Sequence, residues 1–285
     1  ALMAGVVLIV RICYIIYCRV NLPDCRFRPI FDRSLIREMF SFAGWNFVGV
    51  TSGVLRDHGG NILINLFTAP AVNAARGVAV QLNGAVQGFV TNFMTAVNPQ
   101  ITKSYASGDK EYMFALVRRS SRLSFCLLYL IALPVIFNAD YLLGIWLKEV
   151  PAHSAVFVRL FLIFALSESL SSPLITAQLA TGNIRNYQLI VGGLQLMNLP
   201  ISYFVLKAGA PPESIILVAI VISQICLFAR LLLLKGMTGL SASGFIKAVY
   251  LRVAAVFLVS GSVIYLISHM LKSDFVSFVI SCIAC

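Results

Sequence analysis

Long apolar runs, separated by short polar connections, follow one another along almost the whole chain. Each run reaches about 20 residues, the length that an α-helix needs to cross the hydrocarbon core of a bilayer. The runs are continuous and lack the alternation with a period of two that is typical of membrane barrel strands. The pattern predicts an all-α, polytopic membrane helix bundle. The expected spans are 1–18, 38–67, 72–100, 118–147, 155–180, 186–207, 213–234 and 245–270, followed by the start of a ninth.

The composition agrees with a membrane protein. Of the 285 residues, 59% are hydrophobic and only 12% are charged, whereas a soluble domain carries about a quarter charged residues. These values exclude a soluble globular domain, a disordered chain and a disulfide scaffold. The length also exceeds that of a single-span receptor, because it accommodates about eight to ten crossings.

Basic residues are concentrated in alternate connections. The chain has 22 Lys and Arg against 11 Asp and Glu, a net charge of +11, and 15 of the 22 lie in 19–38, 100–122, 183–187 and 230–252. Cytoplasmic loops of multi-pass proteins carry such an excess. We therefore assign these connections to the cytoplasm, place the N-terminus outside, and expect contacts with membrane lipids and no nucleic acid.

The chain begins inside one apolar stretch and ends inside another. No basic segment precedes the first stretch, which argues against a signal peptide. The stretch Phe275–Cys285 is too short to cross a bilayer. We expect the sequence to be a fragment of a longer, transporter-sized protein.

A cluster of polar residues interrupts the second span near its middle. Charges at that depth cost a few kcal/mol each and normally face a partner or a water-filled cavity. The paired glycines permit local unwinding of the helix. In the alternative interpretations, the charges neutralise each other or the span breaks and exposes them. The cluster consists of Arg56, Asp57, His58, Gly59, Gly60 and Asn61.

The third span carries a polar stripe. Its members are 7, 4, 4 and 7 residues apart, which places them on one face of a helix. Such a face avoids lipid, so it contacts either other helices through hydrogen bonds or an aqueous cavity. The arginine near the outer end favours a cavity that meets an anionic group. The stripe consists of Arg76, Asn83, Gln87, Thr91 and Asn98.

Glu168 is the one acidic residue deep in the fifth span, and Ser172 and Thr176 follow it at intervals of four. A carboxylate in the membrane is a candidate proton or sodium site, because a coupling ion can neutralise it. The alternative is a protonated Glu168 that is hydrogen-bonded to the neighbouring serines. Glu168 is thus the candidate residue for H+ or Na+ coupling.

No catalytic or metal-binding motif is present. The three histidines are scattered among different spans, and the chain has no H-E-x-x-H, no phosphate-cradling G-x-x-x-x-G-K-S/T and no G-x-S-x-G. Cys282 and Cys285 form a C-x-x-C without a second ligand pair for zinc. We therefore expect neither an enzyme nor an ATP-driven pump, no catalytic residue, no metal and no cofactor other than a coupling ion.

Six stretches carry a family-specific pattern. They are MFSFAGWN (39–46), NILINLFTAPAVNAAR (61–76), NPQITKSYASGD (98–109), LGIWLKEVP (143–151), SSPLITAQLATGNIRNYQ (171–188) and LQLMNLPISYFVLKAGAPPE (194–213). Together they resemble the bacterial polysaccharide-biosynthesis (O-antigen type) flippases of the multidrug/oligosaccharidyl-lipid/polysaccharide exporter superfamily. The resemblance covers most of the chain.

The resemblance implies a two-lobed, alternating-access transporter in the bacterial inner (plasma) membrane. Such proteins move undecaprenyl-pyrophosphate-linked oligosaccharide units for O-antigen, lipopolysaccharide or capsule biosynthesis, and polysaccharide polymerases are candidate partners. The implied domains are the last helix of the first lobe (1–18), a cytoplasmic basic linker (19–38), the second six-helix lobe (39–234) and additional C-terminal helices (235–285). Family cavities are typically cationic, which gives Arg56 and Arg76 a role toward a pyrophosphate.

Two other functions compete with the flippase. An ion-coupled multidrug antiporter of the same superfamily would need a cavity dominated by acidic and aromatic residues, whereas Glu168 is one acid against two arginines. A membrane scaffold or membrane-embedded glycosyl polymerase would need large loops outside the membrane, and the loops here are short. The expected substrate pathway is Arg56, Asp57, His58, Asn61, Arg76, Asn83 and Gln87.

Overall fold

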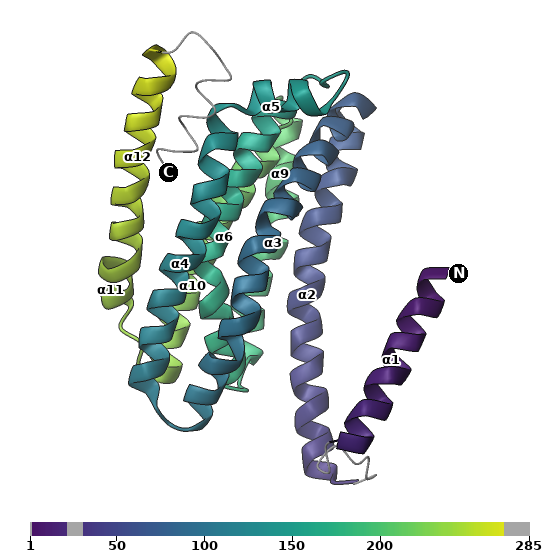
Figure 1. The fold of residues 1–285 in the computed structure, drawn as a ribbon, viewed down its shortest axis with the longest axis vertical. Helices are drawn as coiled ribbons and strands as arrows, with labels where there is room; N and C mark the ends of the chain where they lie inside the picture. The colour runs from purple at the N-terminus through teal and green to yellow at the C-terminus, as the bar shows by residue number, and fades with distance from the viewer. Residues whose placement is uncertain (1, 22–30, 271–285) are drawn as a thin grey trace. The chain divides into compact units, whose positions relative to one another are not determined.

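The computed structural model describes residues 2–21 and 31–270, and all regular structure within these ranges is helical (Figure 1). Six helical segments are long and apolar enough to cross a membrane. The predicted all-α, multi-pass bundle is therefore confirmed. The elements are α1 (Leu2–Asn21), α2 (Arg33–Phe67), α3 (Pro70–Ala106), α4 (Lys110–Phe137), α5 (Ala139–Trp146), α6 (Ser154–Ala180), α7 (Arg185–Tyr187), η2 (Gln188–Gly192), α8 (Gly193–Leu196), α9 (Asn198–Lys207), α10 (Ser214–Thr238), α11 (Ala242–Phe245), η3 (Ile246–Tyr250) and α12 (Leu251–Met270), where η marks a π-helical turn.

The chain divides into two compact units, Ala1–Ser41 and Phe42–Cys285. The first contains α1, whose described side chains are almost all exposed, and the start of α2. Residues 22–30 of the predicted basic linker, with Arg26 and Arg28, lie outside the described residues. So does 271–285, with Cys282 and Cys285. The predicted boundaries at 18, 38 and 234 stay predictions.

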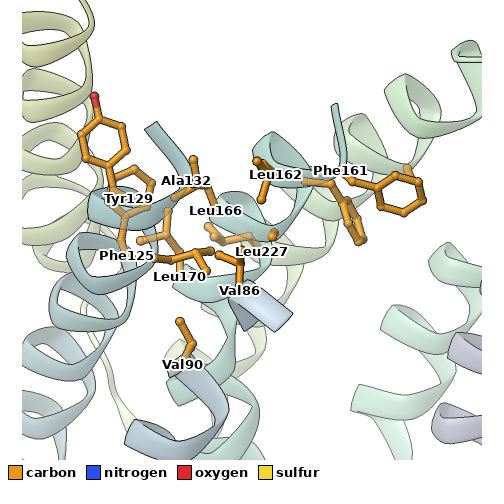
Figure 2. Close-up of a cluster of buried hydrophobic side chains, with 14 of the residues drawn as sticks. Val86, Val90, Phe125, Tyr129, Ala132, Phe161, Leu162, Leu166, Leu170 and Leu227 are labelled. Carbon is orange, nitrogen blue, oxygen red and sulfur yellow. The ribbon is translucent and has the colours of Figure 1, made fainter. Parts of the chain in front are cut away.

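Helix α6 is the centre of the second unit. Its many buried residues are distributed around its circumference, as in a helix that is surrounded by others, and it packs against α3, α4, α5 and α10. Figure 2 shows Leu162, Leu166 and Leu170 of α6 in one cluster with Val86 of α3 and Leu227 of α10. Because lipid tails are as apolar as leucine, close van der Waals packing holds such helices together.

Small residues let α2 approach the bundle closely. Gly49, Ser52, Arg56, Gly60 and Ile64 follow one another at intervals of three or four, which places them on one face. Of these, Ser52, Gly60 and Ile64 are buried. A Cβ atom built on Gly49 would overlap the side chain of Gln188 in η2. The same face therefore brings Arg56 against the bundle.

The predicted single span 118–147 is wrong, because the structure contains two helices there. Helix α4 begins at Lys110, where the Asp109 carboxylate accepts a hydrogen bond from the Tyr112 amide at 3.0 Å. It ends at Phe137, and the backbone and side-chain amides of Asn138 donate to the Pro134 carbonyl at 3.1 and 3.0 Å. These bonds close the helix end, and the short helix α5 follows.

The helix that forms the predicted span 186–207 is irregular at two points. A π-helical turn occupies Gln188–Gly192, and the helix breaks again at Met197 between α8 and α9. Pro200 accounts for the second break, because proline lacks the N–H that would bond to the carbonyl of Leu196 and its ring crowds that carbonyl.

Asp32 caps the first turn of α2. Its carboxylate accepts hydrogen bonds from the Ser34 hydroxyl and the Ser34 amide, both at 2.8 Å, and from the Leu35 amide at 3.4 Å. These bonds favour the ionised form, the Ser34 hydroxyl most, and lower the pKa of the Asp32 carboxyl from its ordinary value. The cap supplies partners for amide groups that a helix start leaves unsatisfied.

We expect Asp32→Ala to increase hydrogen exchange severalfold at the Ser34 and Leu35 amides, whereas Asp32→Asn, which keeps an acceptor oxygen, protects them. Because the pKa is lowered on folding, the cap contributes above the unfolded value of about 3.9 and is lost as pH falls through the folded-state pKa. Hydrogen exchange followed by mass spectrometry measures this. Equal exchange in both variants would contradict the capping role.

Candidate functional site

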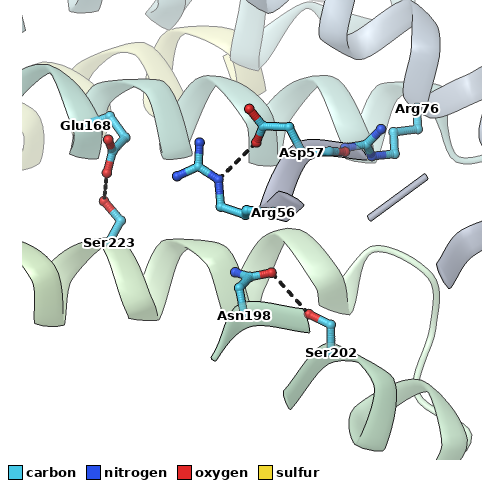
Figure 3. A network of polar contacts seen from close by, with 7 residues as sticks. All are labelled: Arg56, Asp57, Arg76, Glu168, Asn198, Ser202 and Ser223. Carbon is cyan, nitrogen blue, oxygen red and sulfur yellow. Dashed lines mark hydrogen bonds and ion pairs between the residues drawn. The ribbon is translucent and has the colours of Figure 1, made fainter. Parts of the chain in front are cut away.

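The side chains of the predicted cluster at 56–61 point in different directions. Arg56 is turned toward α6, where its guanidinium lies 5.1 Å from the ring centroid of Phe164 (Figure 3). Its Nε donates to Asp57 Oδ1 at 2.9 Å, but the side chain of Arg56 is 19% exposed and that of Asp57 is 63% exposed. His58 is also exposed. The ion pair therefore lies at the edge of the bundle. Of its two side chains, only that of Arg56 reaches into the bundle.

Arg76 joins α3 to α2. Its Nη1 donates to Asn61 Oδ1 and its Nη2 donates to the Asp57 carbonyl at 3.1 Å. The guanidinium also lies 5.5 Å from the ring centroid of Phe161 in α6. Both terminal nitrogens are thus bonded within the protein. This geometry gives Arg76 a structural task in addition to the predicted role in the substrate pathway.

Most of the polar stripe on α3 faces one cavity, which we call the amide cavity. It has a volume of about 300 Å³ and is bounded by α3, α4 and α6. Gln87, Thr91 and Asn98 line it from α3, and Glu168 and Ser172 line it from α6. Asn98 Oδ1 also accepts a hydrogen bond from Thr176 at 2.8 Å. Both interpretations of the stripe hold, because the same face lines a cavity and bonds to a neighbouring helix.

Asn83 lies outside this cavity. Its Oδ1 is buried without a hydrogen-bond partner among the described residues.

A second cavity, which we call the arginine cavity, lies between α2, α6, α10 and the segment around η2. Its volume is about 200 Å³. Arg56 lines it from α2, Glu168 from α6 and Arg230 from α10. Tyr187, Gln188 and Gln195 add a hydroxyl and two amides. Glu168 thus borders both cavities, and the arginine cavity holds two guanidinium groups against one carboxylate.

Arg230 is the main residue that the sequence analysis missed. It was counted in the cytoplasmic stretch 230–252, but the structure places it inside α10 with 1% of its surface exposed. Its Nε and Nη1 are buried and have no hydrogen-bond partner among the described residues. The Glu168 carboxylate and the Tyr187 hydroxyl interact with the Arg230 guanidinium. The sequence did indicate this position, because apolar residues flank Arg230 on both sides in ICLFARLLLL (225–234).

Glu168 is held by α10. Ser223 Oγ donates to its Oε1 at 2.5 Å (Figure 3). This contact provides the serine bond that one interpretation of the sequence expected, although the serine comes from the neighbouring helix. The other carboxylate oxygen makes no hydrogen bond to a described residue, so Glu168 can still serve either cavity.

The arrangement suits an anionic ligand better than a cation. The buried guanidinium of Arg230, which has free donors, and the partly buried guanidinium of Arg56 face a small cavity, and a single carboxylate offsets part of their charge. Arginine presents its donors in a planar fork that matches phosphate and carboxylate groups. In the described part of the chain, no group of His, Cys, Asp and Glu side chains has a geometry that could hold a metal ion.

Comparison of the chain with protein-family models, curated proteins and solved structures found no match.

Arg76→Ala should lower the thermal stability of the protein in detergent or lipid, because it removes two hydrogen bonds between α2 and α3. Such interhelical bonds contribute about 0.6–1.7 kcal/mol each in membrane proteins. Asn61→Ala should cause part of the same loss, and Arg119→Ala, at an exposed position, should leave the melting temperature unchanged. An unaltered melting temperature for Arg76→Ala would show that Arg76 does not hold the helices together.

Proposed function

We propose that the chain forms part of a flippase that moves undecaprenyl-pyrophosphate-linked oligosaccharide units across the bacterial inner membrane for cell-surface polysaccharide biosynthesis. The observation that carries the proposal is the arginine cavity, in which Arg230 is buried with two unbonded guanidinium nitrogens beside Arg56. The resemblance of the stretches 39–46, 61–76 and 171–188 to O-antigen type flippases supports it independently.

The charge of the cavity fits a pyrophosphate. A buried arginine with unsatisfied donors is costly in the absence of a ligand, because two of its guanidinium nitrogens have lost water without gaining a hydrogen bond. A diphosphate would supply acceptor oxygens and negative charge to both arginines. Glu168 lowers the cost of the empty cavity by offsetting one positive charge, and it leaves the cavity with net positive charge.

The polar neutral groups fit the sugar portion of such a substrate. Gln188 and Gln195 border the arginine cavity, and Gln87, Thr91 and Asn98 line the amide cavity on the other side of Glu168. Amides and hydroxyls both donate and accept hydrogen bonds, as sugar hydroxyls require. In this proposal the diphosphate binds near Arg56 and Arg230, and the oligosaccharide extends past Glu168 into the amide cavity.

The multidrug antiporter receives less support from these contacts. A cationic drug would have to enter a cavity where two guanidinium groups face one carboxylate, and like charges at short distance in a low dielectric repel strongly.

Arg230→Met and Arg56→Ala in the full-length protein should each reduce surface polysaccharide about tenfold or more in a strain that lacks its own flippase, because a hydrogen bond to a charged group contributes about 1.5–3 kcal/mol. Methionine fills the buried site of Arg230 without a charge, so folding is retained. Arg119→Ala is the matched control. Normal polymer with both cavity variants at normal membrane levels would reject the assignment, and efflux of cationic dyes would favour the antiporter.

Glu168→Gln tests ion coupling separately. Glutamine keeps the size of the side chain and an acceptor for Ser223 but cannot ionise. If Glu168 takes up H+ or Na+ during transport, the variant should lose the dependence of transport on pH or on sodium. Transport should be followed in vesicles over a range of pH and sodium concentration. Full activity with unchanged dependence on both would exclude Glu168 as the coupling residue.

A further inference from the structure

A continuous chain of hydrogen bonds leads from Glu168 to Tyr250 in η3. Tyr250 OH donates to Gln224 Oε1 at 2.9 Å, and Gln224 Nε2 donates to Ser167 Oγ. Ser167 Oγ is 3.0 Å from Ser223 Oγ, and Ser223 Oγ donates to Glu168 Oε1 at 2.5 Å. The chain therefore crosses α10 and α6 and connects the turn before α12 with the carboxyl group that borders both cavities.

The proton count sets a single direction for the chain. Each serine hydroxyl has one proton to donate. The proton of Ser223 is given to Glu168, so in its contact with Ser167 it accepts. Ser167 accepts from Gln224 and donates to Ser223. Every donor thus points toward Glu168, and bonds aligned in this way polarise and strengthen one another.

The position of Tyr250 does not depend on its hydroxyl group. Phe245, Val249 and Val253 around it are buried in the apolar core, and its ring packs against Phe228 of α10 with centroids 6.2 Å apart. Helix α12 is attached at a second point, where Tyr129 OH and Ser260 Oγ lie 2.6 Å apart. Removal of the Tyr250 hydroxyl should therefore leave the helices in place and break only the first bond of the chain.

We propose that Tyr250 is a positioning residue for Glu168 and that it acts through Gln224, Ser167 and Ser223. The chain holds Oε1 toward α10 and supplies it with a strengthened donor. An amide nitrogen does not ionise in this range, so the chain orients Glu168 and does not conduct protons. The segment of α11, η3 and α12 is in this way connected to the candidate site, a consequence that rests on the proposed role of Glu168 in transport.

Other charged and titratable groups also face Glu168. Arg56 reaches it from α2, Cys226 and Arg230 from α10, and Tyr187 from α7. The two arginines act on the carboxylate directly through the arginine cavity. The chain from Tyr250 adds an effect that depends on hydrogen bonding and not on a nearby charge, so a change from tyrosine to phenylalanine isolates it.

The test is infrared spectroscopy of the protein in lipid, with the bands of Glu168 identified by subtraction of the Glu168→Gln spectrum. Tyr250→Phe should shift the Glu168 carboxylate band, because the loss of one aligned donor weakens the remaining bonds by about 10–30% each. Gln224→Leu should shift the band at least as far. On the Gln224→Leu background, Tyr250→Phe should have no further effect, as expected when two residues act through one path.

Tyr129→Phe is the matched control, since it removes a tyrosine hydroxyl that also bonds to the C-terminal helix segment, at Ser260 of α12. In this variant the Glu168 carboxylate band should not shift. An unshifted band in Tyr250→Phe, or an equal shift in Tyr129→Phe, would overturn the proposal. If the band shifts as expected while the Arg56 and Arg230 variants retain full transport, the positioning role stands and the flippase assignment fails.

Discussion

The absence of water at membrane depth is the constraint on which the rest of this structure depends. A polar side chain there must find its partner on another helix, because lipid offers none. Arg76 meets the requirement through Asn61 and the Asp57 carbonyl, Asn98 through Thr176, and Glu168 through Ser223. These bonds join α2, α3, α6 and α10 at defined registers. Several buried polar atoms depart from the rule, and Arg230 is the charged side chain with two such nitrogens. A ligand is the simplest physical reason to retain this arginine.

Close packing and polar bonding depend on each other in this bundle. The small residues Gly49, Ser52 and Gly60 allow α2 to approach its neighbours, and only this approach brings Arg56 to the arginine cavity. The interruptions between Gln188 and Met197 have a comparable effect, because they set the position of Gln188 and Gln195 beside the same cavity. Helix geometry that departs from a regular α-helix thus serves the site.

Much of the fold followed from the length and continuity of the apolar runs. The predicted spans 155–180 and 213–234 lie close to α6 (Ser154–Ala180) and α10 (Ser214–Thr238). The predicted single span 118–147 was wrong, because the end of α4 depends on the contacts of Asn138 with the Pro134 carbonyl. Apolar periodicity carries no information about such a contact. The predicted span 186–207 corresponds to Arg185–Lys207, whose helix is irregular near Pro200.

For the site, the sequence by itself identified several polar residues within the apolar spans but not Arg230, because cost of burial and spacing can be read along one helix. It identified Arg56, Glu168 and the face of Gln87, Thr91 and Asn98, which line two cavities that share Glu168. Only the tertiary structure decided which of these residues meet. It turned Arg56 inward and left Asp57 and His58 exposed, bonded Arg76 within the protein, and brought Arg230 and Tyr250 toward Glu168 from distant positions in the chain. Such pairings depend on how whole helices pack, which no local pattern specifies.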